Sequence, residues 1–242
     1  MTVTTSTTSR YRWNATTLEG FVQQLAVGYI ARGYFFYVTG LVPERMSTAE
    51  HDERLLVKFD IAHSKWSRYR RKLRAGHCGR QVASVQYLRY RDFWVLVATA
   101  GEHCFFQEHQ KPQAKPWLIE PQYRDVREVP ITFGGYSVSW RDRVSVRISP
   151  QAYRELKAHF LRLAATESKD SLEREFCRAP FEPYGGVTRQ MFAILRAVNR
   201  VRRTAGLPLV PRGCIRVRRR VVKPFADTGN GFFNEESLRL AA

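Results

Sequence analysis

The sequence predicts an α+β fold, with a mainly antiparallel sheet that helices cover on one face. Its 242 residues are 44% hydrophobic and 26% charged, which is typical of a folded protein and not of a disordered chain. Several segments repeat apolar residues every three or four positions, as amphipathic helices do. Two pairs of strand-like segments are each joined by a very short turn. Such turns indicate hairpins, and therefore antiparallel pairing.

The first half of the chain contains three expected helices and a strand. A capping box opens a helix over residues 16–32, where apolar residues follow at helical spacing and Gly33 comes next. The aromatic and β-branched run 34–42 then predicts a buried strand. A second capping box opens a helix over 47–60, and a short basic helix is expected at 64–73.

Two hairpins come next. Residues 82–90 and 93–98 form the first, and residues 136–140 and 144–148 form the second, in which apolar and polar residues alternate clearly. Between the hairpins, residues 101–122 contain three prolines and predict a long surface excursion with one helical turn.

The last third of the chain is expected to be helical and then extended. Ser149 and Pro150 are a good N-cap and first residue for a helix to about 165, and another short helix is expected at 168–177. A long helix over 187–204 follows. After a loop, alternating residues over 214–223 predict a strand.

The succession strand, helices, strand, strand over residues 34–98 resembles the first half of a ferredoxin-like split βαβ unit. RNA-recognition motifs and HUH-type DNA-nicking domains share that architecture, although a fold does not establish a function. The expected organisation is a polar tail at 1–12, an α+β core domain at 13–178, a basic helix-strand extension packed on the core at 179–225, and a polar tail at 226–242.

Positive charge is concentrated in two blocks. The chain has 40 Lys and Arg against 22 Asp and Glu, a net charge of +18. Residues 65–91 contain nine Lys or Arg and no acid, and residues 178–223 contain twelve with one acid. Charge gathered in blocks predicts binding faces for a polyanion, because a charge that served only solubility would be spread over the whole surface.

The predicted helix 187–204 carries the sharpest pattern. At 100° per residue, four arginines fall within an arc of about 60° and the apolar residues lie opposite. A stripe about 20 Å long spans several phosphates, whereas the alternative is a solvated helix face. The predicted strand adds a second arginine face, which could instead protect a sheet edge from aggregation. The nucleic-acid contacts expected in this block are Arg189, Arg196, Arg200, Arg203, Arg216, Arg218 and Arg220.

In the block 65–91, cations interleave with aromatic residues. Arginines can hold phosphates while aromatic faces stack on unpaired bases. The alternative buries the aromatic residues against the sheet, and for Trp66 burial is favoured. The nucleic-acid contacts expected here are Lys65, Arg68, Arg70, Arg71, Lys72, Arg74, Arg89 and Arg91.

Four residues capable of ligating a metal, His77, Cys78, His103 and Cys104, flank the first hairpin. A turn centred between residues 90 and 91 would place Cys78 opposite His103. Zinc accepts this set of ligands, but adjacent residues of a strand point to opposite faces. We therefore expect no metal and no other cofactor.

We expect a nucleic-acid-binding protein whose partner is RNA or single-stranded DNA, with RNA preferred. It would act as a non-catalytic subunit of a ribonucleoprotein or mobile-element complex, with other protein subunits as further partners. The GxxxxGK[ST], HExxH, GxSxG and His-x-His motifs are missing, so no catalytic residue is assigned. Two alternatives stay open: a divergent metal-dependent nuclease or transposase-like or HUH-like strand transferase, and a protein-interaction subunit that docks on an acidic partner.

The cysteine pattern and the hydropathy bear on location. Four widely spaced cysteines without a CxxC pair favour a reduced protein, and no stretch approaches eighteen apolar residues. We expect a cytoplasmic protein with no membrane contact.

Overall fold

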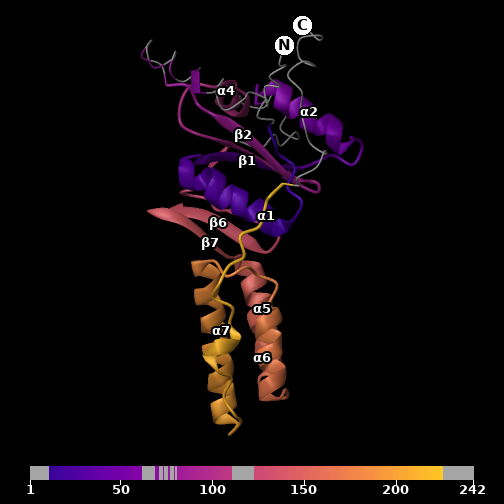
Figure 1. Ribbon diagram of the computed structural model, residues 1–242, viewed down its shortest axis with the longest axis vertical. Coiled ribbons are helices and arrows are strands. Elements are labelled where there is room, and N and C mark those ends of the chain that lie inside the picture. The colour runs from indigo at the N-terminus through magenta and orange to yellow at the C-terminus, as the bar shows by residue number, and fades with distance from the viewer. Residues whose placement is uncertain are drawn as a thin grey trace, which may run out of the picture. The chain divides into compact units, whose positions relative to one another are not determined.

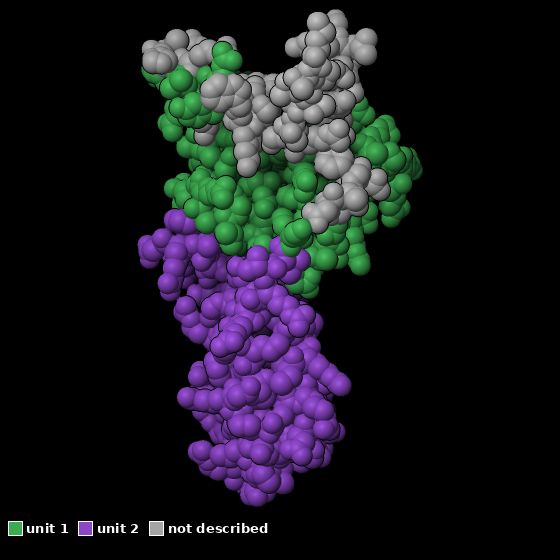
Figure 2. All heavy atoms as spheres, in the orientation of Figure 1, with its two compact units in different colours: residues 1–128, 223–242 green, residues 129–222 purple. Residues whose placement is uncertain are grey.

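The chain divides into two compact units, coloured separately in Figure 2. Unit 1 comprises residues 1–128 and 223–242, and unit 2 comprises residues 129–222. The computed structural model describes residues 11–61, 69–70, 73, 76, 79, 81–110 and 123–225. The division falls after residue 128, whereas the sequence suggested residue 178. All the helices between residues 150 and 204 therefore belong to one unit.

Unit 1 contains a four-stranded antiparallel sheet in the order β2-β3-β1-β4. Its strands are β1 (Phe36–Leu41), β2 (Val85–Tyr90), β3 (Phe93–Ala98) and β4 (Arg124–Asp125). Strand β3 pairs antiparallel with both β1 and β2 and so lies between them. Helix α2 (Thr48–Lys58) follows β1, and α4 (Cys104–Gln110) follows β3. The described elements thus succeed one another as β-α-β-β-α-β, and the split βαβ prediction is confirmed.

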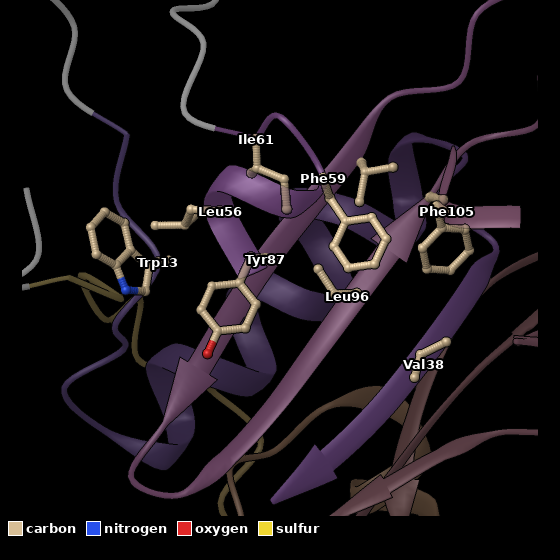
Figure 3. Packing of buried hydrophobic residues seen from close by; sticks show 10 residues of the cluster. Trp13, Val38, Leu56, Phe59, Ile61, Tyr87, Leu96 and Phe105 are labelled. Atoms are coloured by element: carbon tan, nitrogen blue, oxygen red, sulfur yellow. The ribbon is translucent and has the colours of Figure 1, made fainter. Parts of the chain in front are cut away.

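One face of this sheet packs on α2 and α4. Alternate residues of the three long strands meet the inner sides of the two helices, and together they form a buried cluster (Figure 3). Its members on these elements are Val38, Val85, Tyr87, Leu96, Ala98, Leu56, Phe59 and Phe105.

The opposite face of the sheet packs on the helical segment 18–32, which consists of α1 (Leu18–Gln23), the π-helical turn η1 (Gln24–Tyr29) and the 3-10 turn η2 (Ile30–Arg32) (Figure 1). The ring of Phe21 lies 5.8 Å from that of Phe93 and 6.4 Å from that of Tyr90. Helices therefore cover this sheet on both faces, whereas the sequence predicted helices on one face.

Local signals explain where the helices of unit 1 begin and end. The side chain of Thr17 accepts a hydrogen bond from the backbone of Gly20, and Ser47 does the same for Glu50 at the start of α2. Gly33 ends the first helical segment with a φ of 89°, a value that favours glycine. The cap predicted at Ser47 is therefore confirmed, whereas the first helix is capped by Thr17, one residue later than the predicted capping box of residues 16–19 implied.

Unit 2 begins with a three-stranded antiparallel sheet in the order β5-β6-β7. The strands are β5 (Ile131–Phe133), β6 (Tyr136–Arg141) and β7 (Arg143–Ile148). The hairpin β6–β7 turns at Asp142, whose φ is 58°, and pairs Tyr136 with Ile148. This confirms the predicted second hairpin.

Three helices complete unit 2: α5 (Pro150–Leu163), α6 (Lys169–Arg178) and α7 (Gly185–Thr204). Ser149 caps α5, as expected. Helices α5 and α6 form an antiparallel hairpin, in which Phe160 stacks on Phe176 with ring centroids 4.0 Å apart. Helix α7 packs against β7 and α5. Among the described helices, none combines the length and the apolar character needed to cross a membrane.

The described chain after α7 contains the 3-10 turn η3 (Arg212–Cys214) and no strand, so the strand predicted over 214–223 was wrong. Asn199 holds the start of this segment, since its side chain donates to the carbonyl of Val210 at 2.8 Å and accepts from its N–H at 2.9 Å. Val217 and Val221 are 61% and 83% exposed. Alternating residues form a strand only where the backbone can pair, and no strand pairs with this segment in the part of the chain described.

Candidate nucleic-acid interface

Helix α7 separates its apolar and basic residues onto two faces, as the sequence predicted. The buried apolar residues are Val187, Met191, Ile194, Leu195 and Val198. Arg189, Arg196, Arg200 and Arg203 are all exposed, and we call these four the arginine stripe. At 1.5 Å per residue, the stripe extends about 21 Å along the helix.

Polar side chains fix the position of α7 within unit 2. Near its N-terminus, the Gln190 side chain accepts from the N–H of Ile148 at 2.8 Å and donates to its carbonyl at 3.1 Å. Gly186 allows the close approach of β7, because a Cβ there would lie 2.4 Å from the carbonyl oxygen of Val146. The helix is therefore a firmly held platform for the arginine stripe.

At the other end of α7, Arg202 is buried. Its guanidinium donates to three backbone carbonyls, those of Pro208 at 2.7 Å, Glu167 at 2.8 Å and Ala164 at 2.9 Å. These bonds tie α7 to the end of α5 and to the loop that follows α7. Sequence reasoning missed this role, although the helical wheel places Arg202 on the apolar side and could have shown it.

The arginine stripe has no described counter-charge. The ion pairs found in the described part of unit 2 are His159–Glu175, Lys169–Glu173 and Arg216–Glu182, and none of them involves the stripe. Unit 2 contains 19 Lys and Arg against 7 Asp and Glu, a net charge of +12, whereas unit 1 carries +6. The stripe thus lies on the more basic unit and leaves four guanidinium groups exposed to solvent.

In the segment after α7, Arg216 is exposed but has partners within the chain. The guanidinium of Arg216 donates to the carbonyls of Ala179 at 2.9 Å and Phe181 at 3.0 Å, and lies 3.6 Å from Glu182. Arg216 therefore helps hold this segment in place. The side chains of Arg218 and Arg220 are exposed, so they are better placed than Arg216 to meet a partner.

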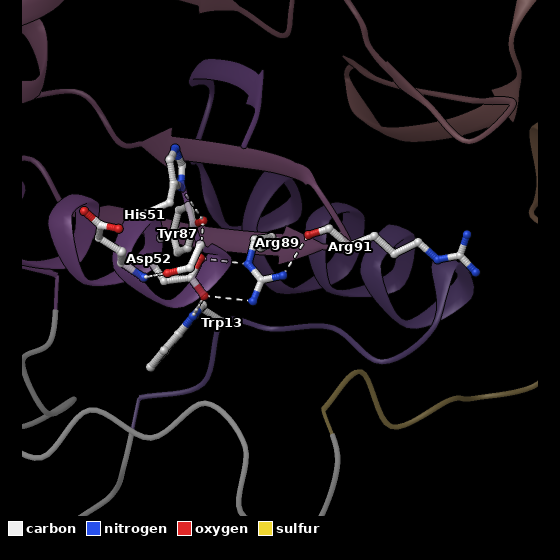
Figure 4. A network of polar contacts seen from close by, with 8 residues as sticks. Trp13, His51, Asp52, Tyr87, Arg89 and Arg91 are labelled. Carbon is white, nitrogen blue, oxygen red and sulfur yellow. Dashed lines mark hydrogen bonds and ion pairs between the residues drawn. The ribbon is translucent and has the colours of Figure 1, made fainter. Parts of the chain in front are cut away.

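Arg89, which we expected to bind nucleic acid, is only 8% exposed (Figure 4). Its Nε and Nη2 atoms donate to the two carboxylate oxygens of Asp52 at 2.7 and 2.8 Å, and Nη1 donates to the carbonyl of Arg91 at 2.7 Å. Because β2 directs this side chain toward α2, Arg89 is paired inside unit 1. Its assignment as a phosphate contact was wrong.

Asp52 is the centre of this buried network. It also accepts hydrogen bonds from the hydroxyl of Tyr87 at 2.6 Å and from the indole N–H of Trp13 at 2.8 Å. Burial, together with the charge of Asp52 and its hydrogen bond, raises the pKa of Tyr87 well above its usual value. The adjacent His51 is buried as well, and its burial lowers its pKa despite the opposing effect of Asp52. The network joins α2, β2 and the N-terminal segment.

The structure does not support base stacking on the sheet of unit 1. Tyr87 is fully buried, and helical segments cover both faces of the sheet. Arg91 keeps an exposed position at the β2–β3 turn, where its guanidinium lies 5.4 Å from the centre of the Tyr90 ring. In this block, therefore, Arg91 stays a candidate contact.

The rest of the first basic block lies largely beyond what the structure describes. Arg70 is described and exposed. Most of the basic helix expected at 64–73 falls outside the described residues, as do Lys65, Arg68, Arg71, Lys72 and Arg74.

The prediction that Cys78 lies opposite His103 assumed a hairpin register that differs from the observed one. Tyr90 pairs with Phe93, so the hairpin is centred between residues 91 and 92. Cys104 begins helix α4 and is not on a strand. His77 and Cys78 are outside the described residues. Within the described part of the chain, no three or more His, Cys, Asp or Glu side chains gather closely enough to hold a metal.

The chain was also compared with known proteins. No protein-family model, no curated protein and no solved structure matches it.

Proposed function

We propose that the protein binds nucleic acid through the phosphate backbone, with the arginine stripe of α7 as its principal contact surface. The observation that carries the proposal is the four exposed guanidinium groups on one face of a helix whose opposite face is buried. Guanidinium groups bind phosphate by charge-assisted, often bidentate hydrogen bonds.

Helix α7 contains no acidic residue, and no described ion pair involves the arginine stripe, which supports the same function. A solvated surface helix usually mixes charges of both signs, and pairs between them stabilise it. The stripe has one sign only, on a unit with a net charge of +12. A polyanion would relieve the repulsion among these four arginines, and it would release counterions on binding.

Single-stranded RNA is the first ligand to test, with single-stranded DNA and duplex RNA of the same sequence as comparisons. Fluorescence anisotropy of the full chain with labelled oligonucleotides, at about 50 to 200 mM salt, measures the affinity and its salt dependence. Four phosphate contacts on a single strand give a slope of log affinity against log salt of about −2.8, or roughly a 50-fold loss over this range.

The proposal fails if the chain does not bind any of the three oligonucleotides at the lowest salt concentration. Binding that does not change with salt would also contradict it, because contacts to phosphates must displace counterions. The ranking of the three ligands then identifies the preferred class of nucleic acid.

A further inference from the structure

Unit 1 contains a cavity of about 790 Å³ at the end of its sheet away from the β2–β3 turn. Residues before β1, before β2 and after β3 line it, together with the residues that follow β4. The lining residues that bear on its chemistry are Arg32, Gly33, Phe35, Phe36, Thr99 and Arg127. A volume of this size lies within the range of roughly 300 to 1,000 Å³ that small-molecule sites occupy.

The charged side chains among the described residues that line the cavity are both arginines, Arg32 and Arg127. Arg32 is exposed at the end of η2, where Gly33 turns the chain into β1. No acidic residue is found in the described lining. The charge therefore favours an anionic ligand.

Arg127 is held in a defined orientation. Its Nε and Nη2 atoms donate to the carboxylate of Asp125 at 3.0 and 2.6 Å, and its guanidinium carbon lies 4.9 Å from the centre of the Phe35 ring and 5.8 Å from that of Phe36. Burial alone would raise the pKa of Asp125, but the hydrogen bonds and charge of Arg127 lower it below its usual value. The hydrogen bonds to Asp125 thus orient the guanidinium group.

The fixed guanidinium group still meets solvent, since 48% of the Arg127 side chain is exposed. A guanidinium plane offers a stacking surface for a base, and its remaining N–H groups can donate to a phosphate. Phe35 and Phe36 add an aromatic wall beside it. These groups suit a ligand with both a flat ring and a negative charge.

We propose that this cavity binds a nucleotide, with the phosphate held by Arg32 and Arg127 and the base placed against Arg127 and the two phenylalanines. The paired arginines favour a phosphate over a neutral nucleoside, while the aromatic wall favours a base over inorganic phosphate. The site does not include any residue of the arginine stripe, so either proposal can fail without the other.

Isothermal titration calorimetry of the full chain with AMP, GMP, CMP and UMP tests the proposal. At least one nucleotide should bind at one site per chain with a Kd below about 1 mM. The corresponding nucleoside and inorganic phosphate should each bind at least about tenfold more weakly, because each lacks one half of the recognition.

Variants locate the site. Arg127→Gln and Arg32→Gln should each weaken nucleotide binding by roughly tenfold or more. Arg45→Gln removes the same charge from an exposed residue that follows β1, at the opposite end of the sheet, and should leave the affinity unchanged. If thermal denaturation shows that Arg127→Gln unfolds the protein, the Arg32→Gln variant tests the site instead. Arg32 is exposed, so its replacement should leave the fold intact.

Three results would overturn the proposal: no nucleotide binds at about 1 mM, inorganic phosphate or nucleoside binds as tightly as nucleotide, or the folded Arg32→Gln variant binds like the wild type. Replacing the arginine stripe with Gln should not change nucleotide binding here. An effect of that replacement would contradict the assignment to this cavity.

Discussion

In unit 1, Arg89 is buried with its guanidinium on the carboxylate of Asp52, whereas in unit 2 the arginine stripe is exposed and takes part in no described ion pair. Both sets come from arginine-rich parts of the chain. The difference is that α2 supplies a buried counter-charge to Arg89, while no described ion pair involves the arginine stripe. A count of arginines thus overestimates the number available for binding, unless the intramolecular partner of each arginine is known.

Arg202 adds a third arrangement to this comparison. It is buried like Arg89, but its partners are three backbone carbonyls and not a carboxylate. It lies next in sequence to the exposed Arg203. Neighbouring arginines of one helix can therefore have opposite roles, which substitutions can separate.

The largest expected effect is at Asp52. Asp52→Asn removes the counter-charge of Arg89 and should lower the free energy of unfolding by about 3 to 5 kcal/mol, because an unpaired charge is left buried. Urea denaturation measures the loss. Glu53→Gln, on an exposed neighbour in the same helix, is the matched control and should change stability by less than about 0.5 kcal/mol. A loss at Asp52 no larger than that of the control would remove the contrast between the two units.

The next effect is at Arg202. Arg202→Met should lower the free energy of unfolding by about 1 to 3 kcal/mol, because the carbonyls of Ala164, Glu167 and Pro208 lose their donor. The control is Arg203→Gln, which should stay within about 0.5 kcal/mol of the wild type in the same denaturation measurement. Equal stability of the two variants would show that the buried bonds of Arg202 do not hold α7.

A smaller effect concerns pH. Burial keeps the pKa of His51 below that of an unfolded histidine, so the unfolded state binds the proton first as the pH falls below about 6.5. This favours unfolding in acid. Between about pH 8 and pH 5.5, His51→Gln should therefore lose less stability than the wild type, as measured by the urea midpoint at each pH. Parallel losses in the two proteins would mean that His51 does not contribute to the pH dependence.

The smallest effect on stability is expected at the arginine stripe itself. Replacing Arg189, Arg196, Arg200 and Arg203 with Gln changes exposed side chains on the face away from the buried residues. The melting temperature of this fourfold variant should stay close to that of the wild type. A large drop would indicate that these arginines support the fold.

Features that depend on local sequence were predicted correctly. The caps at Ser47 and Ser149 and the turn at Asp142 are all decided within a few residues. The exposure of the arginine stripe follows from the helical period of α7 alone. Part of the candidate site could therefore be derived without tertiary contacts.

Features that depend on distant partners were not predicted. Asp52 and Arg89 are 37 positions apart, and no local pattern joins them. The helical segment 18–32 packs on β2 and β3, which come much later in the chain. Residues 214–223 alternate like a strand, but no strand pairs with them among the described residues. In each case, the burial or pairing of the residues depended on which distant segments the fold placed beside them.

The most direct test of the arginine stripe compares two fourfold Arg or Lys to Gln variants that remove equal charge from unit 2. One replaces the stripe, and the other replaces the exposed residues Lys157, Arg162, Arg174 and Arg178 on α5 and α6. The salt dependence of single-stranded RNA binding is then measured for both and for the wild type. The stripe variant should bind more weakly, with a log-log slope shallower by about 3, while the control should keep a slope close to that of the wild type. Equal slopes in the two variants would contradict the account, because binding would then follow the net charge of unit 2 and not the stripe on α7.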